Sequence, residues 1–207
     1  MTVAIIGLGN MGKGLARRLS GKTALVAGVR DPAQAAAFGR EHGIRVTDYQ
    51  EAIAQADIVV LALPYVAALE FAAGTPALAG KIVVDISNPV RPDFSGLALG
   101  FDTSAAEEIQ KAAPGARVVK AFNTIFSGVF DTAAAATADV PVFVAGNDAA
   151  AVEAVAGLAQ QAGFAVERVG ALDGARLLEP VGMLNIRLGY GLGRGTSIAP
   201  SWLSLAA

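Results

Sequence analysis

The chain has 207 residues, 54% hydrophobic and 16% charged, which suits one sizeable folded core and excludes a disordered polypeptide. Its formal net charge is −2 and it has no basic run, so we expect no nucleic-acid partner. The absence of cysteine excludes disulfides and thiol nucleophiles, and with a single histidine we expect no metal site.

The N-terminal stretch is a short apolar run that ends in the pattern G-x-G-x-x-G. Residues 3–6 form the run, Gly7, Gly9 and Gly12 form the pattern, and helical periodicity follows. In dinucleotide-binding folds the first glycine makes a tight turn, the second lets a pyrophosphate approach the backbone, and the third lets helix and strand pack closely. We therefore predict a dinucleotide site here, with a plain strand-to-helix turn as the alternative.

The second predicted strand, residues 23–29, ends in Arg30, about twenty residues after the glycine turn. At this point an acidic residue favours NAD, whereas an arginine accommodates the 2′-phosphate of NADP. Asp31 is explained as the N-cap of a helix that begins at Pro32. Arg30 therefore predicts NADP as the cofactor.

Strands and helices alternate through the rest of the first 170 residues. We expect further strands at 44–46, 57–63, 81–86, 117–121, 140–145 and 164–169, and helices at 32–42, 48–56, 65–78, 103–112 and 148–162. Residues 90–101 are expected to form a loop, and 131–137 are ambiguous. This alternation predicts an α/β fold, a Rossmann-type doubly wound parallel sheet with a short C-terminal helical extension.

The predicted NAD(P)-binding domain spans residues 1–170, and residues 171–207 form an extension that is not an independent domain. Residues 176–190 are nearly apolar all round, so this helix must be buried in its own core or against a second subunit. Residues 191–202 are rich in glycine but follow no strand. We interpret them as a helix end with an irregular tail, the alternative being a lid that contacts substrate.

Nothing in the sequence indicates a membrane or export segment. The most apolar stretch, residues 58–73, is interrupted by Pro64 and Glu70, and the first strand has no basic region before it. We expect a cytoplasmic protein.

The chain offers no convincing pair of acid–base residues, and we assign no catalytic residue. Lys120 follows a predicted strand and is interpreted as paired with a carboxylate, with a general acid as the alternative. This shortage is informative, because hydride transfer between two ring cofactors depends chiefly on holding the rings face to face.

Several separated segments resemble known reductase families. Residues 7–14, 28–30, 63–64 and the tail resemble the NADP oxidoreductases that use the deazaflavin coenzyme F420. Residues 84–89 and 118–125 are more similar to the cytosolic domain of the six-transmembrane metalloreductases, which passes hydride from NADPH to a flavin. The resemblance implies an NADP-dependent oxidoreductase with F420, FMN or FAD as hydride acceptor, and a homodimer.

The resemblance also implies positions for the cofactor. It places Gly9, Asn10, Met11 and Gly12 on the pyrophosphate, with Arg30 on the 2′-phosphate. It places Leu63, Pro64, Asn88, Pro89, Asn123, Thr124 and Ile125 beside the nicotinamide. Two positions depart from the deazaflavin enzymes, which commonly have serine at Val29 and histidine at Asn123.

The sequence leaves three further functions open. The glycine motif also opens β-hydroxyacid dehydrogenases and imine reductases, which generally append a long helical domain with a catalytic lysine. Residues 171–207 contain no lysine. A non-catalytic NADP(H)-binding sensor is the second of these functions, and the soluble half of a flavin-mediated metal reductase is the third.

Overall fold

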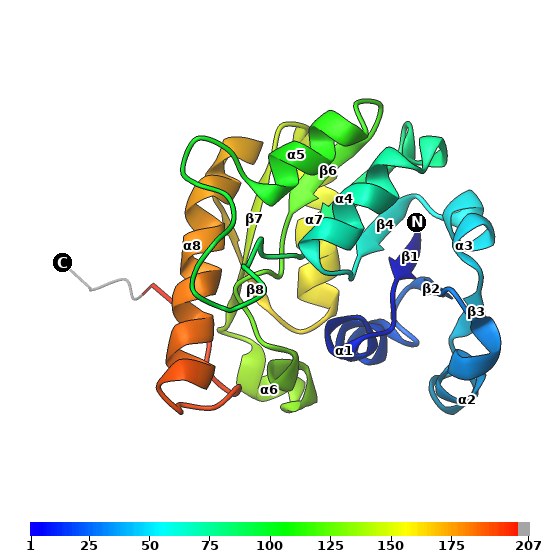
Figure 1. Cartoon of the computed structure of the whole chain (residues 1–207). Coiled ribbons are helices and arrows are strands. Elements are labelled where there is room, and N and C mark those ends of the chain that lie inside the picture. Colours follow the sequence, from blue (N-terminus) through cyan, green and yellow to red (C-terminus); the bar gives the residue numbers. More distant parts are fainter. Residues whose placement is uncertain (203–207) are drawn as a thin grey trace.

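Eight strands form one sheet in the order β3-β2-β1-β4-β5-β6-β7-β8 (Figure 1). The computed structural model describes residues 1–202. The strands are β1 (Thr2–Ile6), β2 (Ala24–Gly28), β3 (Arg45–Thr47), β4 (Ile58–Leu61), β5 (Ile82–Asp85), β6 (Arg117–Lys120), β7 (Pro141–Gly146) and β8 (Ala165–Arg168). The strand order reverses between β1 and β4, and ligands of such sheets bind at the carboxyl ends of the strands near that point. The predicted Rossmann-type doubly wound fold is confirmed.

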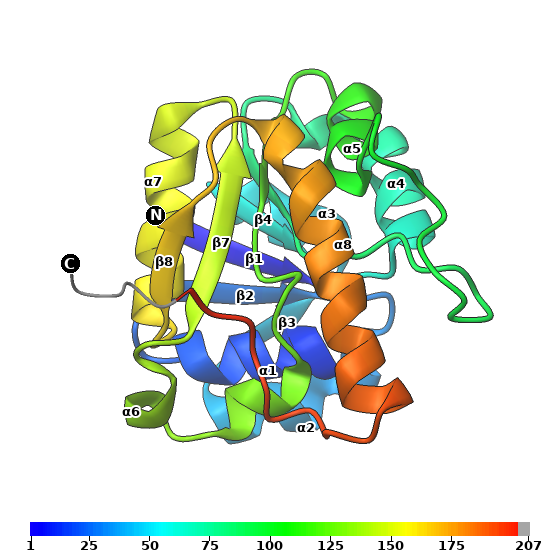
Figure 2. The same cartoon turned by 90° about the vertical axis from the view of Figure 1, so that its left-hand side faces the viewer.

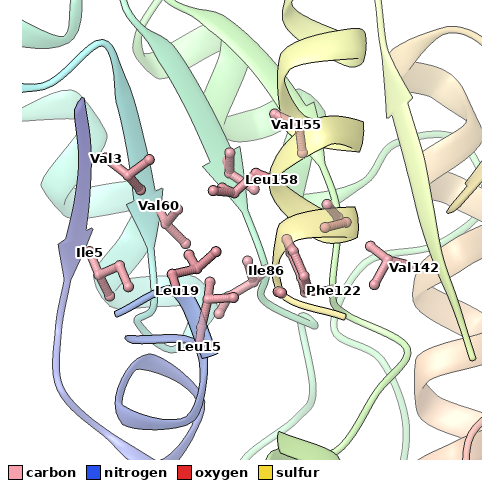
Figure 3. Packing of buried hydrophobic residues seen from close by; sticks show 14 of the residues in the cluster. Val3, Ile5, Leu15, Leu19, Val60, Ile86, Phe122, Val142, Val155 and Leu158 are labelled. Atoms are coloured by element: carbon pink, nitrogen blue, oxygen red, sulfur yellow. The ribbon is translucent and has the colours of Figure 1, made fainter. Parts of the chain in front are cut away.

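Helices cover both faces of the sheet (Figures 1 and 2). The first face carries α1 (Asn10–Leu19), α2 (Pro32–His42) and α7 (Ala149–Gln161). The second carries α3 (Tyr49–Gln55), α4 (Tyr65–Ala73), α5 (Ala105–Ala112) and α8 (Ala175–Ile186). Figure 3 shows the core under the first face, where Ile5 and Val60 of neighbouring strands lie close to Leu15 and Leu19 of α1. Because side chains alternate along a strand, the residues between them serve the second face.

One pairing corrects the prediction of a wholly parallel sheet, because β7 runs antiparallel to β6. A parallel return would need a helix that crosses a face of the sheet. The connection 121–140 contains only a 3₁₀ turn (Ser127–Asp131) and the short α6 (Ala134–Thr137), so the chain turns back at the same edge. The buried guanidinium of Arg18 on α1 donates hydrogen bonds to several backbone carbonyls of this connection and holds it in place.

Capping residues begin two helices where the sequence predicted them. The carboxylates of Asp31 and Asp48 accept hydrogen bonds from first-turn amides of α2 and α3. The helix predicted over 65–78 is wrong at its end. Helix α4 stops at Ala73, and a separate 3₁₀ turn (Pro76–Leu78) follows, because a proline cannot continue the α-helical hydrogen bonding.

The buried face of α8 mixes apolar and polar residues, since Ala175 and Leu178 join the hydrophobic core beside polar neighbours. Glu179, Gly182 and Asn185 are buried, whereas Leu177 and Leu184 are 62% and 56% exposed. Of the two environments predicted for this helix, burial in its own core is therefore wrong for these leucines. Burial against a second subunit stays a prediction.

After α8 the chain makes a π-helical turn (Arg187–Gly191) and continues without helix or strand to Trp202. Figure 2 shows this segment crossing back toward β7 and β8. The ring of Trp202 packs edge-on against Phe143 of β7, with 5.3 Å between the ring centres. The prediction of a helix end with an irregular tail is confirmed for the described part, and residues 203–207 of the predicted extension lie outside it.

Candidate cofactor and substrate site

The glycine turn between β1 and α1 has the shape that a phosphate anion requires. Gly7 has a φ of +97°, a conformation that side chains rarely adopt. A Cβ added at Gly12 would lie 2.0 Å from the carbonyl oxygen of Gly7, so only glycine lets α1 pack on the turn. A Cβ added at Gly9 would meet no atom within 4 Å, and no side chain caps α1. Open space before the free amides and the positive end of a helix fits a pyrophosphate.

Beside this turn lies a cavity of about 790 Å³ that carries two cations. Its lining residues are Gly7, Leu8, Lys13, Val29, Arg30, Asp31, Pro32, Gln34, Ala35, Phe38 and Tyr49. Arg30 is exposed at the end of β2, and the Lys13 ammonium lies 5.8 Å from the centre of the Phe38 ring. The Asp31 carboxylate accepts a hydrogen bond from the amide of Ala33 at 3.0 Å, so it caps α2 as predicted. Two cations beside an already engaged carboxylate suit the 2′-phosphate of NADP.

A smaller cavity of about 260 Å³ lies where the carboxyl ends of β5 and β6 meet the start of α1. Its lining residues are Asn10, Met11, Ile86, Asn88, Phe122, Asn123, Ile125, Phe126, Ser127, Gly182, Asn185, Ile186 and Tyr190. Three residues predicted to flank the nicotinamide, Asn88, Asn123 and Ile125, therefore share one space with Asn10 and Met11. No carboxylate, lysine, arginine or histidine is among these lining residues, so the described walls hold amide and apolar groups, the hydroxyl of Ser127 and the phenol of Tyr190.

Two asparagines join the loops that follow β5 and β6. Nδ2 of Asn88 donates to the backbone carbonyl of Asn123 at 2.7 Å, and Nδ2 of Asn123 donates to Oδ1 of Asn88 at 2.9 Å. Asn185 of α8 donates to the backbone carbonyl of Thr124 at 3.0 Å. The fully buried Phe122 has a φ of +59°, which turns the chain sharply after β6 and brings Asn123 against the neighbouring loop.

Three buried oxygens in these loops have no hydrogen-bond partner among the described residues. They are Oγ of Ser87, Oδ1 of Asn123 and Oγ1 of Thr124. Buried polar atoms are nearly always paired in folded proteins, so such a group calls for an explanation. Of these three residues only Asn123 lines the smaller cavity, so its Oδ1 is the acceptor that the carboxamide N–H of a nicotinamide in that cavity would meet.

A fully buried lysine lies beneath the smaller cavity. Nζ of Lys120 contacts Oδ2 of Asp85 and Oε1 of Glu179, each at 2.8 Å, and donates to the carbonyl of Ser87 at 2.6 Å. Glu179 also accepts from the amide of Ala105 at the start of α5. Burial raises the pKa of Glu179, and the Lys120 ammonium opposes this shift. The interpretation of Lys120 as a carboxylate-paired lysine is confirmed, and its three acceptors occupy the three donors of its ammonium group.

Four of the predicted nicotinamide residues line neither cavity. Leu63 packs against the core of the second face and lies close to Gly7. Pro64 is exposed immediately before α4, whereas Pro89 and Thr124 are buried in the loops that follow β5 and β6. The structure thus places all four near the carboxyl edge of the sheet but outside the walls of these cavities.

Within residues 1–202, no three histidine or acidic side chains lie close enough together to hold a metal ion. Over the same part of the chain, every helix is too short or insufficiently apolar to cross a bilayer.

Comparisons with known proteins agree with this geometry. Residues 2–89 match the model of the family described as NADP oxidoreductase, coenzyme F420-dependent. The crystal structure of a proposed F420-dependent NADP-reductase from Arthrobacter sp. fb24 superposes with a TM-score of 0.84. That protein is 32% identical, and the match covers 99% of this chain and 100% of that one. This chain belongs to the coenzyme F420-dependent NADP oxidoreductase family. It is therefore an NADP-dependent oxidoreductase.

More distant relatives share part or all of the fold. Metalloreductase STEAP3 of Rattus norvegicus is 30% identical to this oxidoreductase over 180 residues, 86% of this chain but 36% of that protein. This chain thus spans about a third of the length of the metalloreductases that it matches. A reductive aminase from Aspergillus terreus superposes with a TM-score of 0.68 at 23% identity, with 93% of this chain and 63% of that one covered, which shows a common fold alone.

Three residues of the oxidoreductase that shape the two cavities were not predicted. Lys13 adds a second cation beside Arg30, Gly182 lets α8 lie against the loop after β5, and Asn185 bonds the loop after β6. A Cβ added at Gly182 would lie 2.6 Å from Oδ1 of Asn88, so glycine is required for this contact. The helical spacing of Glu179, Gly182 and Asn185 was a usable signal, because small and polar residues on one face of an apolar helix indicate a polar contact.

Proposed function

We propose that this oxidoreductase transfers hydride between NADPH and a flavin or deazaflavin acceptor of the F420 type. The observation that carries the proposal is the smaller cavity, which adjoins the glycine turn and has no carboxylate, lysine, arginine or histidine among its described lining residues. Hydride transfer between two rings requires contact and orientation rather than a dedicated proton donor. The similarity over the whole chain to a protein described as a proposed F420-dependent NADP-reductase supports the same acceptor class.

In this proposal the residues of the chain bind and orient. The amides at the start of α1, with Gly9, Asn10, Met11 and Gly12, hold the pyrophosphate. Gly7 makes the turn that leaves room for it. NADPH bound in this way supplies the hydride to the acceptor.

The proposed nicotinamide site lies at the carboxyl ends of β4, β5 and β6. Asn88, Asn123 and Ile125 contact the ring within the smaller cavity. Leu63, Pro64, Pro89 and Thr124 support the loops around it. The buried ion cluster of Lys120 holds the turn at Ser87 in place, which gives the asparagine pair a rigid base.

The experiment is a stopped-flow measurement of NADPH oxidation with F420, FMN and FAD as separate acceptors. We expect rapid oxidation with at least one of them, no NADPH oxidation with imines, and no NADP⁺ reduction with hydroxyacids. Tight NADPH binding without oxidation by any of the three acceptors would instead identify a non-catalytic sensor.

The preference for NADPH depends on Arg30, which faces the larger cavity beside Lys13. We expect Arg30→Ala to weaken NADPH binding about 10- to 100-fold, because a charge-assisted contact to phosphate contributes about 1.5–3 kcal/mol. NADH binding should change less than about twofold, since NADH lacks the 2′-phosphate. Titration of the cofactor fluorescence measures both constants.

The control is Arg40→Ala, which removes an exposed arginine of α2 that does not line the cavity. Equal losses of NADPH and NADH affinity in Arg30→Ala would overturn the assignment of Arg30 to the 2′-phosphate.

We also propose that residues 171–207 serve the acceptor and a homodimer contact rather than form a separate domain. The exposed Leu177 and Leu184 lie on the outer face of α8, where a second subunit would remove their apolar surface from water. The sedimentation coefficient of the intact protein tests the dimer.

A further inference from the structure

A third cavity, of about 750 Å³, lies between the loop 90–101 and the carboxyl end of α8. Its lining residues are Phe94, Ser95, Met183, Ile186, Arg187, Tyr190, Gly191 and Leu192. In Figure 1 this loop, drawn in green, runs beside the orange helix α8. Ile186 and Tyr190 also line the smaller cavity, so the two spaces meet at these side chains.

The boundary between the two spaces is built by a close contact in the π-helical turn. The Tyr190 ring packs edge-on against Phe126, with 5.3 Å between the ring centres. A Cβ added at Gly189 would lie 2.6 Å from the Phe126 ring, so glycine lets the turn reach it. Single π-helical turns are rare and occur often at functional sites. Here the turn places Arg187 and Tyr190 on one cavity wall.

The chemistry of this cavity is aromatic and apolar with one cation. Phe94 and Tyr190 are 68% and 66% exposed, which is unusual for large rings in a folded chain. Arg187 is the one charged side chain among the described lining residues. No described carboxylate forms an ion pair with its guanidinium. Flat apolar walls with a single arginine suit a planar ring system that carries an anionic group.

We propose that this cavity binds the ring system of the acceptor and that Arg187 binds the phosphate on its side chain. The inference rests on the proposed function, because the acceptor ring must reach the nicotinamide through the shared boundary at Ile186 and Tyr190. F420, FMN and FAD all carry phosphate on the chain attached to the central ring. A guanidinium is well shaped to bind a phosphate with two parallel hydrogen bonds.

The test is direct binding to the protein saturated with NADP⁺, measured by the fluorescence of FMN and of riboflavin, which lacks the phosphate. We expect FMN to bind at least tenfold more tightly than riboflavin, which corresponds to about 1.4 kcal/mol. Arg187→Met should remove this advantage and leave riboflavin affinity unchanged. Arg187→Lys, which keeps the charge but not the planar fork, should retain part of it.

The control is Arg194→Met, which makes the same chemical change on an exposed arginine outside the cavity lining and should alter neither constant. Repeating the titrations with F420 and its unphosphorylated deazaflavin core distinguishes the two acceptor classes. Equal binding of the phosphorylated and unphosphorylated forms in both pairs, or an unchanged preference in Arg187→Met, would overturn the inference.

The binding test is separable from the proposed function. A wild-type protein that binds FMN or F420 through Arg187 but transfers no hydride would refute the function and leave the phosphate site standing. A protein that oxidises NADPH with these acceptors while Arg187→Met binds them normally would refute only the site.

Discussion

Gly9→Ala should fold normally but bind NADPH much more weakly. The added methyl group meets no atom of the folded chain within 4 Å, and the φ of −72° at Gly9 is ordinary for alanine. We therefore expect the free energy of unfolding to stay within about 1 kcal/mol of wild type, the cost of a poorer N-cap. The same methyl group occupies the space where the pyrophosphate approaches the backbone. NADPH affinity should fall at least about 100-fold, or about 2.7 kcal/mol.

Gly12→Ala differs from Gly9→Ala, because it should lower the stability of the fold as well as NADPH binding. In Gly12→Ala the new Cβ collides with the carbonyl oxygen of Gly7 at 2.0 Å, so α1 must move. We expect a loss of about 3 kcal/mol or more in stability together with the loss of NADPH. The control is Gly157→Ala in α7, where the Cβ also meets nothing and helix propensity favours alanine by about 1 kcal/mol. Normal NADPH binding by Gly9→Ala would contradict the role of the turn.

Lys120→Met should destabilise the protein by about 3–5 kcal/mol, because it leaves two carboxylates buried without their cation. Asp85 and Glu179 are 0% and 2% exposed, so water cannot replace the ammonium without local opening. Methionine has nearly the same length as lysine, which limits the contribution of lost packing. Urea denaturation followed by far-UV circular dichroism measures the change. A loss below about 1 kcal/mol would show that the cluster is not needed for stability.

The companion variant Glu179→Gln keeps the acceptor for Lys120 and the amide of Ala105 but removes the carboxyl titration. Burial raises the pKa of Glu179, so the native state holds this proton more tightly than the unfolded state. The stability gained from holding this proton is fully present below the ordinary pKa of glutamate. It is lost as the pH rises through the raised pKa of Glu179 in the native state. The stability of Glu179→Gln should therefore depend less on pH above about 4.3 than that of wild type.

Much of the fold was predictable because its signals are local. Parallel strands covered on both faces are continuous apolar runs, and Asp31 and Asp48 mark helix starts within a few residues of the chain. The orientation of β7 was not predictable in this way. It depends on a connection that Arg18 holds through contacts with residues more than a hundred positions away, and no short pattern encodes such contacts.

For the candidate site, the sequence indicated several residues that line the two cavities, and their roles toward the cofactor stay predictions. The glycine turn and Arg30 follow from spacing, and the resemblance supplied the asparagines that line the smaller cavity. The contribution of α8 was missed because its leucines dominate the sequence pattern. The spacing of Gly182 and Asn185 indicated a polar face on this helix, but the packing of α8 was needed to show that Gly182 meets the loop after β5 and Asn185 the loop after β6.

The most direct test of ring-to-ring transfer is to follow an isotope. NADPH carrying deuterium at one face of C4 is incubated with the protein and F420, whose ring accepts hydride at a carbon that does not exchange with water. We predict that the deuterium reaches the reduced deazaflavin from one of the two labelled faces only, as expected for a fixed stacking of the two rings. Failure to transfer the label to F420, together with no NADPH oxidation by FMN or FAD under conditions where NADPH binds, would contradict the proposed function.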